Sequence, residues 1–131
     1  MDKVLIDTSV WIEFFRKHEP CHAVVTELID GERVYCVGLV LAELMQGAKS
    51  EKELEVLASF PSVFDFLPET PELWSEAGRL AFTLRRRGTT IGLADCYLAV
   101  AAVTAGVRIA TLDGHFDILR EVTAFDLYPV S

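Results

Sequence analysis

The stretch that decides the fold is Val4-Leu5-Ile6-Asp7-Thr8-Ser9, close to the start of the chain. Its three consecutive apolar residues predict a short buried strand, and the three polar residues after them are types that commonly begin a helix. The amphipathic pattern over residues 10–16 predicts that helix. A buried strand that leads directly into a helix is the unit from which parallel α/β sheets are built.

The same alternation continues through the rest of the chain. Further strands are expected at residues 33–37, 63–67, 107–110 and 124–128. Helices are expected at residues 20–29, 39–46, 50 to near Pro61, 70–87, 93–104 and 115–119. Strands separated by helical crossovers imply a parallel sheet. We therefore expect an α/β fold, a three-layer sandwich with a central parallel sheet flanked by helices, formed by residues 1–131 as a single domain.

The composition excludes several classes of protein. The chain has 131 residues, of which 51% are hydrophobic, so intrinsic disorder is excluded. The most apolar stretch, residues 91–103, is interrupted by Asp95 and is too short for a membrane span. The start of the chain has no apolar leader, so a cytoplasmic protein is expected. Cys21, Cys36 and Cys96 are expected to be buried, reduced thiols.

The net charge is unevenly distributed along the chain. The total of −8 argues against a nucleic-acid binder, whose surface is usually basic. Residues 77–112, however, hold five arginines and one acidic residue, a local balance of +4. Three of these arginines are consecutive: Arg85, Arg86 and Arg87. They could contact nucleic-acid phosphates, or they could simply solvate the end of a helix, where arginine is favoured.

Four acidic residues are expected at one edge of the sheet, beyond the carboxyl ends of its strands. Asp7 follows the first strand, Glu43 lies one turn into the helix after the second, Asp95 lies in the first turn of the helix at 93–104, and Asp113 follows the strand at 107–110. A buried ionised carboxylate is costly unless it is paired or bound to a metal. No basic residue adjoins these acids in the sequence. Carboxylate-only ligation predicts Mg²⁺ or Mn²⁺.

Each acidic residue also has a purely structural explanation. Asp7 could cap the helix that follows it, and Asp95 could interact with the dipole of its own helix. Glu43 could be an ordinary surface residue, and Asp113 could belong to a turn with Gly114. These explanations do not account for the common placement of all four at one edge.

Four segments of the chain resemble, in order and spacing, the acidic motifs of PIN-domain ribonucleases, and most of all those of the VapC toxins of toxin–antitoxin pairs. They are VLIDTSVWIE (residues 4–13), LAELMQG (41–47), GLADCYLAVAA (92–102) and ATLDGHF (110–116). The resemblance extends over residues 3–129. It implies a PIN-like fold and metal-dependent hydrolysis of RNA phosphodiester bonds.

The resemblance also implies roles for individual residues. Asp7, Glu43, Asp95 and Asp113 would hold Mg²⁺ or Mn²⁺, with Thr8, Ser9 and Thr111 as supporting hydroxyls. With such a function, the local charge of +4 gives the three arginines a role as well: at least one of Arg85, Arg86 and Arg87 is expected to contact RNA phosphates. The chain departs from the family at His115, where an acidic residue often stands, and the role of Asp117 is left open. A homodimer and a cognate antitoxin covering the groove are the implied partners.

The chemistry of phosphodiester hydrolysis agrees with these residue types. Divalent cations shield the charge of the phosphate, lower the pKa of bound water and stabilise the leaving oxygen. Carboxylates hold the cation, and an acidic residue that is not a ligand can orient the water. The alternatives are a PIN-like housekeeping nuclease and a non-catalytic binding module.

Two further patterns have competing interpretations. His18-Glu19-Pro20-Cys21-His22 has the spacing of a zinc-protease helix, but a proline inside it is incompatible with a continuous helix. Several large apolar residues could form either core or an exposed interface. They are Trp11, Phe14, Phe15, Val40, Leu44 and Met45.

Overall fold

A computed structural model describes residues 2–130, and within this range the sheet has four parallel strands in the order β3-β2-β1-β4. The strands are β1 (Val4–Ile6), β2 (Val34–Cys36), β3 (Asp65–Phe66) and β4 (Arg108–Ala110). In the register of the sheet, Val4 pairs with Val34 on one side and Arg108 on the other. Because the strands are parallel, their carboxyl ends all meet at one edge.

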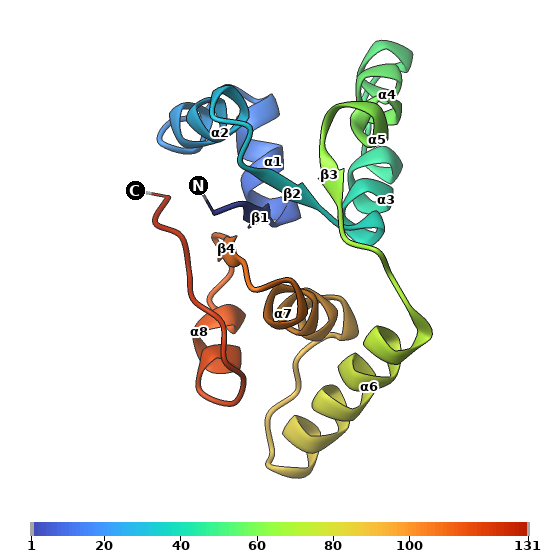
Figure 1. Cartoon of the computed structure of the whole chain (residues 1–131), viewed down its shortest axis with the longest axis vertical. Coiled ribbons are helices and arrows are strands. Elements are labelled where there is room, and N and C mark those ends of the chain that lie inside the picture. Colours follow the sequence, from blue (N-terminus) through green and yellow to red (C-terminus); the bar gives the residue numbers. More distant parts are fainter. Residues whose placement is uncertain (1, 131) are drawn as a thin grey trace.

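Helices cover both faces of the sheet, as the sequence predicts. They are α1 (Thr8–Phe15), α2 (Cys21–Asp30), α3 (Gly38–Gln46), α4 (Glu51–Ala58), α5 (Phe60–Val63), α6 (Pro71–Arg86), α7 (Leu93–Ala105) and α8 (His115–Arg120). Figure 1 shows α1 and α2 above the sheet, α7 and α8 below it, and α6 packed outside α7. Helices α3 to α5 lie beside β2 and β3. The expected three-layer α/β sandwich is confirmed.

The core is built around the central strand and the central helix. Every residue of β1 is fully buried, as is typical of a parallel strand covered on both faces. In α7, seven consecutive residues from Cys96 to Ala102 are buried. This helix is enclosed because the sheet lies on one side of it and α6 packs against the other. Both elements lead to the edge where the acidic residues lie.

The region around Pro61 differs from the sequence prediction. A helix ending near Pro61 and a strand at 63–67 were expected, but α4 ends at Ala58 and Pro61 lies in the first turn of the short helix α5. Proline is compatible with a first turn because the amide hydrogen it lacks has no partner there. Phe60 and Phe64 contact Trp11 at ring-centroid distances of 5.0 and 5.8 Å and hold this turn against α1. Strand β3 is consequently only two residues long.

The expected strand at 124–128 is reduced to a single bridge. Ile109 donates a hydrogen bond to the carbonyl of Asp126 and accepts one from the amide of Tyr128, at 3.0 and 2.8 Å. In residues 2–130 the pairing of this segment with β4 is limited to this one bridge, between Ile109 and Leu127. The prediction of a fifth strand is therefore wrong, although the segment does lie beside β4.

Other expectations are met inside the fold. The three cysteines are free and buried, and burial, with the negative charge of Asp65, raises the pKa of the Cys36 thiol to about 12. Helix α2 begins only at Cys21, so His18 lies outside it. Half of the apolar residues that could have formed an interface are core residues, namely Trp11, Val40 and Leu44. Across residues 2–130, every helix is too short or too polar to cross a membrane.

Candidate active site

Asp7 lies at the end of β1 and is held by three hydrogen-bond donors. The amide of Thr8 donates to Oδ1 at 2.8 Å, which makes Asp7 the N-cap of α1. The hydroxyls of Ser9 and Thr111 both donate to Oδ2, each at 2.8 Å. The residue is only 7% exposed. Asp7 therefore caps a helix and also has a carboxylate fixed in one orientation by its neighbours.

The same hydroxyls fasten the loop after β4 to the start of α1. Thr111 Oγ1 accepts a hydrogen bond from the amide of Asp113 at 3.0 Å, and Ser9 Oγ accepts one from the amide of Leu112 at 3.1 Å. Asp7 also donates its own amide to the carbonyl of Ala110 at 2.9 Å. Two segments from opposite ends of the sequence thus form one rigid edge.

Glu43 projects from the middle of α3 toward α1. Its Oε1 accepts a hydrogen bond from the hydroxyl of Thr8 at 2.9 Å. The residue is half-buried and lines a cavity of about 270 Å³ between α1, α3 and α4, together with Phe15, Arg16 and Lys49. Glu43 is therefore not an ordinary surface residue, because its carboxylate is held by the hydroxyl of Thr8, the residue after Asp7.

Asp95 lies in the first turn of α7, but it does not cap this helix. The N-cap is Gly92, and within the described range no side chain caps α7. Asp95 Oδ2 instead lies 3.2 Å from Nδ1 of His115. Burial raises the pKa of the Asp95 carboxyl, and the negative charges of Asp113 and Asp7 raise it further, while the contact with His115 partly offsets this.

Asp113 and His115 belong to the turn that leads into α8. The amide of His115 donates to Asp113 Oδ1 at 2.9 Å, the pattern of an aspartate that stabilises its own turn. The imidazole Nδ1 lies 3.6 Å from the same oxygen. His115 was not predicted as a member of the site, although its position two residues after Asp113 was a signal.

The structure brings most of the predicted site residues together. One ligand atom each from Asp95, Asp113 and His115 lies within 4.8 Å of the other two. Asp7 is close enough for its charge to act on the pKa of Asp95. Glu43 is joined to this group through Thr8. Asp117 is exposed on α8 and lies outside the group.

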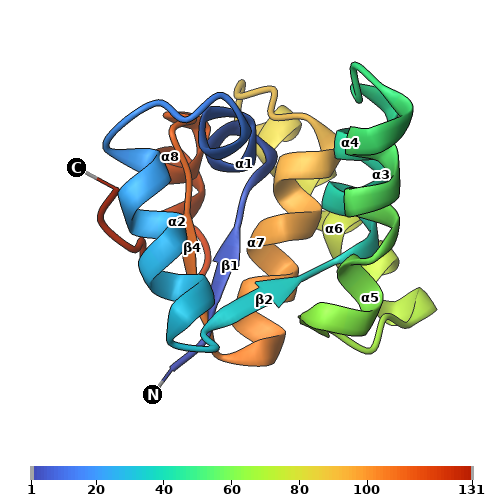
Figure 2. The ribbon, with the colours of Figure 1, turned by 90° about the horizontal axis from the view of Figure 1, so that it is seen from above.

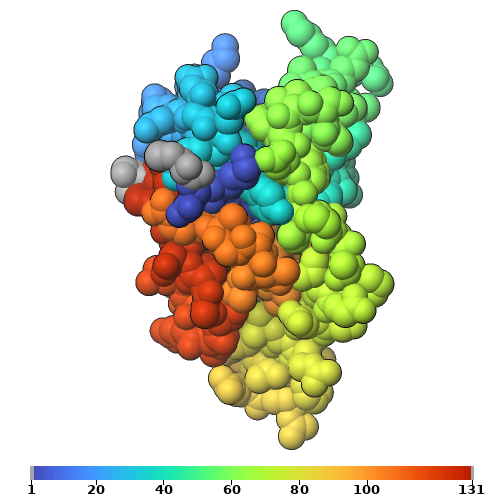
Figure 3. All heavy atoms as spheres, viewed as in Figure 1, coloured from blue at the N-terminus to red at the C-terminus, as the bar shows by residue number. Residues whose placement is uncertain are grey.

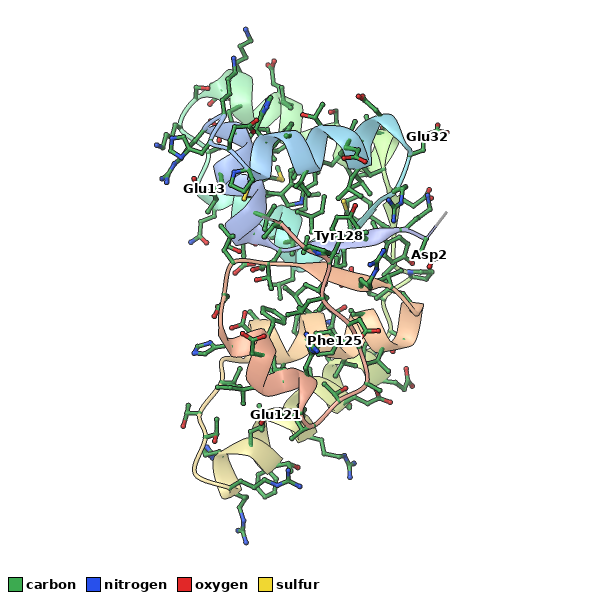
Figure 4. The ribbon with its side chains drawn as sticks, turned by 90° about the vertical axis from the view of Figure 1, so that its left-hand side faces the viewer. Asp2, Glu13, Glu32, Glu121, Phe125 and Tyr128 are labelled. Carbon is green, nitrogen blue, oxygen red and sulfur yellow. The ribbon has the colours of Figure 1, made fainter. Side chains whose placement is uncertain are left out.

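The three consecutive arginines lie apart from the acidic residues, at the exposed end of α6. Arg85 and Arg86 form the last turn of this helix and Arg87 caps it. Figure 2 shows the loop between α6 and α7 at the same end of the molecule as α1, and Figure 3 shows this segment projecting at the lower end of the molecule. In the side view of Figure 4, the loop between α6 and α7 lies on the left, the side where Glu13 is labelled, whereas Asp2 and Glu32 lie on the right.

The donor set of the acidic group fits a divalent cation. In the described part of the chain, the carboxylates of Asp95 and Asp113 contact the imidazole of His115, which is charged only when protonated, and they pair with no lysine or arginine. The pKa of Asp95 is raised mainly by burial and further by the negative charges of Asp113 and Asp7, which His115 offsets only in part, so a bound cation would stabilise the ionised carboxylate. Hard divalent cations prefer carboxylate oxygens and would supply the missing positive charge.

Comparison with known proteins identifies the family. The model of the PIN domain matches residues 4–122. The chain belongs to the PIN-domain family. This confirms the resemblance inferred from the four acidic motifs.

Known members of the family are similar to this PIN domain over most of its length. Ribonuclease VapC1 of Methanocaldococcus jannaschii is 29% identical over 120 residues, which cover 91% of this chain and 82% of the relative. Ribonuclease VapC32 of Mycobacterium tuberculosis is 32% identical over 111 residues, or 84% of each chain.

Solved structures show the same fold. A chain of DNA-bound VapBC from Salmonella typhimurium aligns with this PIN domain with a TM-score of 0.73 and 23% identity, over 98% of both chains. VapBC2 from Rickettsia felis, bound to a promoter DNA fragment, gives a TM-score of 0.73 at 18% identity, over 95% of this chain and 96% of that one. The PIN model and the structural matches agree with the expected fold class.

Proposed function

We propose that this protein is a divalent-metal-dependent endoribonuclease that hydrolyses RNA phosphodiester bonds as the toxin of a toxin–antitoxin pair. The observation that carries the proposal is the group formed by Asp95, Asp113 and His115 beside the fixed carboxylate of Asp7, in a PIN domain whose relatives are VapC ribonucleases. The cofactor we propose is Mg²⁺ or Mn²⁺.

The acidic residues would hold the metal, and the hydroxyl residues would hold the acids. Asp7, Asp95 and Asp113 are the proposed ligands. When bound, a divalent cation shields the phosphate charge and lowers the pKa of a bound water. Ser9 and Thr111 both donate to Oδ2 of Asp7, so this carboxylate is oriented before the substrate arrives.

Glu43 completes the proposed site from the opposite side. Thr8 engages Oε1 of Glu43, which leaves Oε2 to bind the metal or to orient the attacking water. The cavity beside Glu43 contains both an apolar surface from Ile12 and Phe15 and cationic side chains from Arg16 and Lys49. Such a lining suits a nucleotide next to the scissile phosphate, because a base stacks on aromatic rings and a phosphate attracts cations.

Arg85, Arg86 and Arg87 are proposed to contact RNA phosphates farther from the cleaved bond. They end α6, and the loop that follows them leads to Asp95 at the start of α7. The segment from residue 77 to 112 carries a charge balance of +4 in a chain of −8. A basic segment next to an acidic site would draw the backbone of RNA toward it.

We also propose partners and a compartment. Solved VapBC complexes share this fold, which supports a cognate antitoxin as a partner. The second partner that we propose is another copy of this chain, as the resemblance to the VapC toxins implies. The proposed compartment is the cytoplasm, where an RNA substrate is available and where three free, buried thiols stay reduced. The single domain of residues 1–131 remains a proposal, and the PIN model covers most of it.

The nuclease proposal is tested with purified protein free of antitoxin. We expect it to cleave structured RNA in Mg²⁺ or Mn²⁺, and we expect EDTA or Asp7→Asn to abolish cleavage. The matched control is Asp117→Asn, which changes an exposed carboxylate outside the site and should keep full activity. Full cleavage in EDTA would contradict the mechanism.

The toxin assignment has a separate test in cells. Expression of the wild-type chain should arrest growth, and co-expression of the protein encoded by the adjacent upstream reading frame should relieve the arrest. Asp7→Asn should be harmless at the same protein level. Harmless expression of an active wild-type nuclease would instead indicate a housekeeping enzyme.

A further inference from the structure

His115 stands where the proposed oxygen ligands meet, at a position where the PIN-domain motif often has an acidic residue. We propose that His115 Nδ1 is itself a metal ligand and that it makes this site prefer Mn²⁺ over Mg²⁺. The inference rests on the proposed metal site but adds a ligand and a selectivity to it.

The distances around Nδ1 fit shared coordination of one ion. Nδ1 lies 3.2 Å from Asp95 Oδ2 and 3.6 Å from Asp113 Oδ1. Adjacent ligands of an octahedral ion with bonds of about 2.1 Å lie about 3.0 Å apart. Only small side-chain rotations therefore separate the observed arrangement from one in which all three atoms bind the same ion.

The fold holds His115 at this point from two directions. Its amide donates to Asp113 Oδ1 at 2.9 Å, which fixes the turn. The next residue, Phe116, is fully buried and anchors the start of α8 in the core. Asp95 reaches the imidazole from α7, 20 residues earlier in the chain. The side chain itself is about half exposed, so an ion and its waters can reach it.

The nature of the donor atom decides which metal is favoured. Mg²⁺ strongly prefers oxygen ligands and keeps several waters, whereas imidazole nitrogen binds first-row transition metals well. Replacing an oxygen ligand by a nitrogen ligand therefore weakens the binding of Mg²⁺ more than the binding of Mn²⁺. The competing interpretation is that a protonated His115 is only a counter-ion of the two carboxylates, in which case it would oppose metal binding.

The experiment measures metal binding to the full chain by calorimetry, with Mn²⁺ and Mg²⁺ separately. We expect His115→Gln to weaken Mn²⁺ binding about tenfold or more and to change Mg²⁺ binding much less. His115→Asp should restore an all-oxygen site and lower the ratio of Mn²⁺ to Mg²⁺ affinity. The matched control is His18→Gln, because His18 also contacts a carboxylate through Nδ1, that of Glu13, but lies away from the site.

A second measurement reports the ligand directly. Pulsed electron paramagnetic resonance of the Mn²⁺-loaded wild type should show hyperfine coupling to a directly bound nitrogen. This coupling should disappear in His115→Gln and persist in His18→Gln. Thermal melts of the metal-free variants establish that each is folded before binding is compared.

The possible results separate this inference from the proposed function. An unchanged affinity ratio, no nitrogen coupling, or tighter binding of both metals by His115→Gln would overturn the inference. Nitrogen coupling in a protein that cleaves no RNA would support the inference and contradict the nuclease proposal. RNA cleavage without nitrogen coupling would do the reverse.

Discussion

The hydroxyl of Thr8 donates a hydrogen bond to Oε1 of Glu43 at 2.9 Å and so joins the start of α1 to the middle of α3. Through this contact, the residue after Asp7 sets the orientation of an acid 35 positions later in the chain. Glu43 is the one acidic residue of the candidate site that lies on α3.

Removing the Thr8 hydroxyl should reduce activity more than stability. Thr8→Val keeps the shape of the side chain but leaves Oε1 of Glu43 without its donor. We expect RNA cleavage to fall about 10- to 100-fold, as is typical when a residue that orients a ligand is lost. The free energy of unfolding should fall by only about 1 kcal/mol. Thr8→Ser retains the hydroxyl and should recover most of the activity; equal losses in both variants would contradict an orienting role.

Removing the Thr111 hydroxyl should reduce both activity and stability. Thr111→Val deprives buried Asp7 of one of its donors and the amide of Asp113 of its acceptor. We expect the free energy of unfolding to fall by about 1 to 3 kcal/mol, because the buried carboxylate of Asp7 loses one of its donors and the amide of Asp113 loses its acceptor. Chemical denaturation measures this, with Thr111→Ser as the control that keeps both hydrogen bonds. A Thr111→Val variant as stable as wild type would show that Asp7 does not depend on this hydroxyl.

Asp95 predicts a pH dependence of the metal-free protein. Its pKa is raised in the folded state, mainly by burial. The folded state therefore holds this proton more tightly than the unfolded state, and stability falls as pH rises from the unfolded pKa of about 3.9 through the raised folded pKa. In EDTA at neutral pH, Asp95→Asn should be more stable than wild type. The difference should vanish in acid below both pKa values.

Metal addition should reverse this order. A cation that binds only the folded wild type raises its melting temperature. At a hundredfold excess over the dissociation constant, the free energy of unfolding increases by about 2.7 kcal/mol. The melting temperature of Asp95→Asn should rise less. Asp95→Ala is the control for a structural role of the side chain. If wild type ignores Mg²⁺ and Mn²⁺ and Asp95→Ala is equally destabilised in EDTA and in metal, Asp95 is not a ligand.

The arginines at the end of α6 predict a salt dependence of RNA binding. Replacing Arg85, Arg86 and Arg87 by Gln should weaken binding and reduce the slope of log affinity against log salt by about 0.7 to 0.9 for each lost phosphate contact. The control is Arg33→Gln. Arg33 lies over the ring of Tyr128 and donates to the carbonyl of Asp2, which Figure 4 shows on the side of the molecule away from the loop between α6 and α7. An unchanged slope in the triple variant would mean that these arginines only solvate the helix end.

Local patterns were enough to predict the central layer of the fold. Strand β1 was predicted with its observed bounds, because three buried apolar residues followed by polar helix-start residues have few other interpretations. The short helix α5 was not predicted, because it depends on the packing of Phe60 and Phe64 against Trp11, far away in the sequence. The extent of β3 depended on the same contact.

The candidate site was predictable where its residues follow strands. Topology alone indicates that Asp7 and Asp113 lie near each other, because β1 and β4 are adjacent parallel strands. The contact of His115 with Asp95 could not be predicted, since it depends on how the turn at Gly114 aims one side chain toward another helix. A second contact that the sequence did not indicate lies outside the site and involves Glu69, in the loop before α6. Its carboxylate accepts hydrogen bonds from Tyr97 and from the amide of Gly38, which links the loop before α6 to α7 and α3.

The hydrogen bond from Thr111 to Asp7 has a consequence for how the protein is made. These residues are 104 positions apart, and at about 5 to 20 residues per second a ribosome needs on the order of 5 to 20 s to synthesise the chain between them. Until β4 and its loop emerge, Asp7 lacks one of its donors, and Asp113 and His115 are absent. The candidate site is therefore incomplete while most of the chain is being synthesised, and it can assemble only when translation is nearly complete.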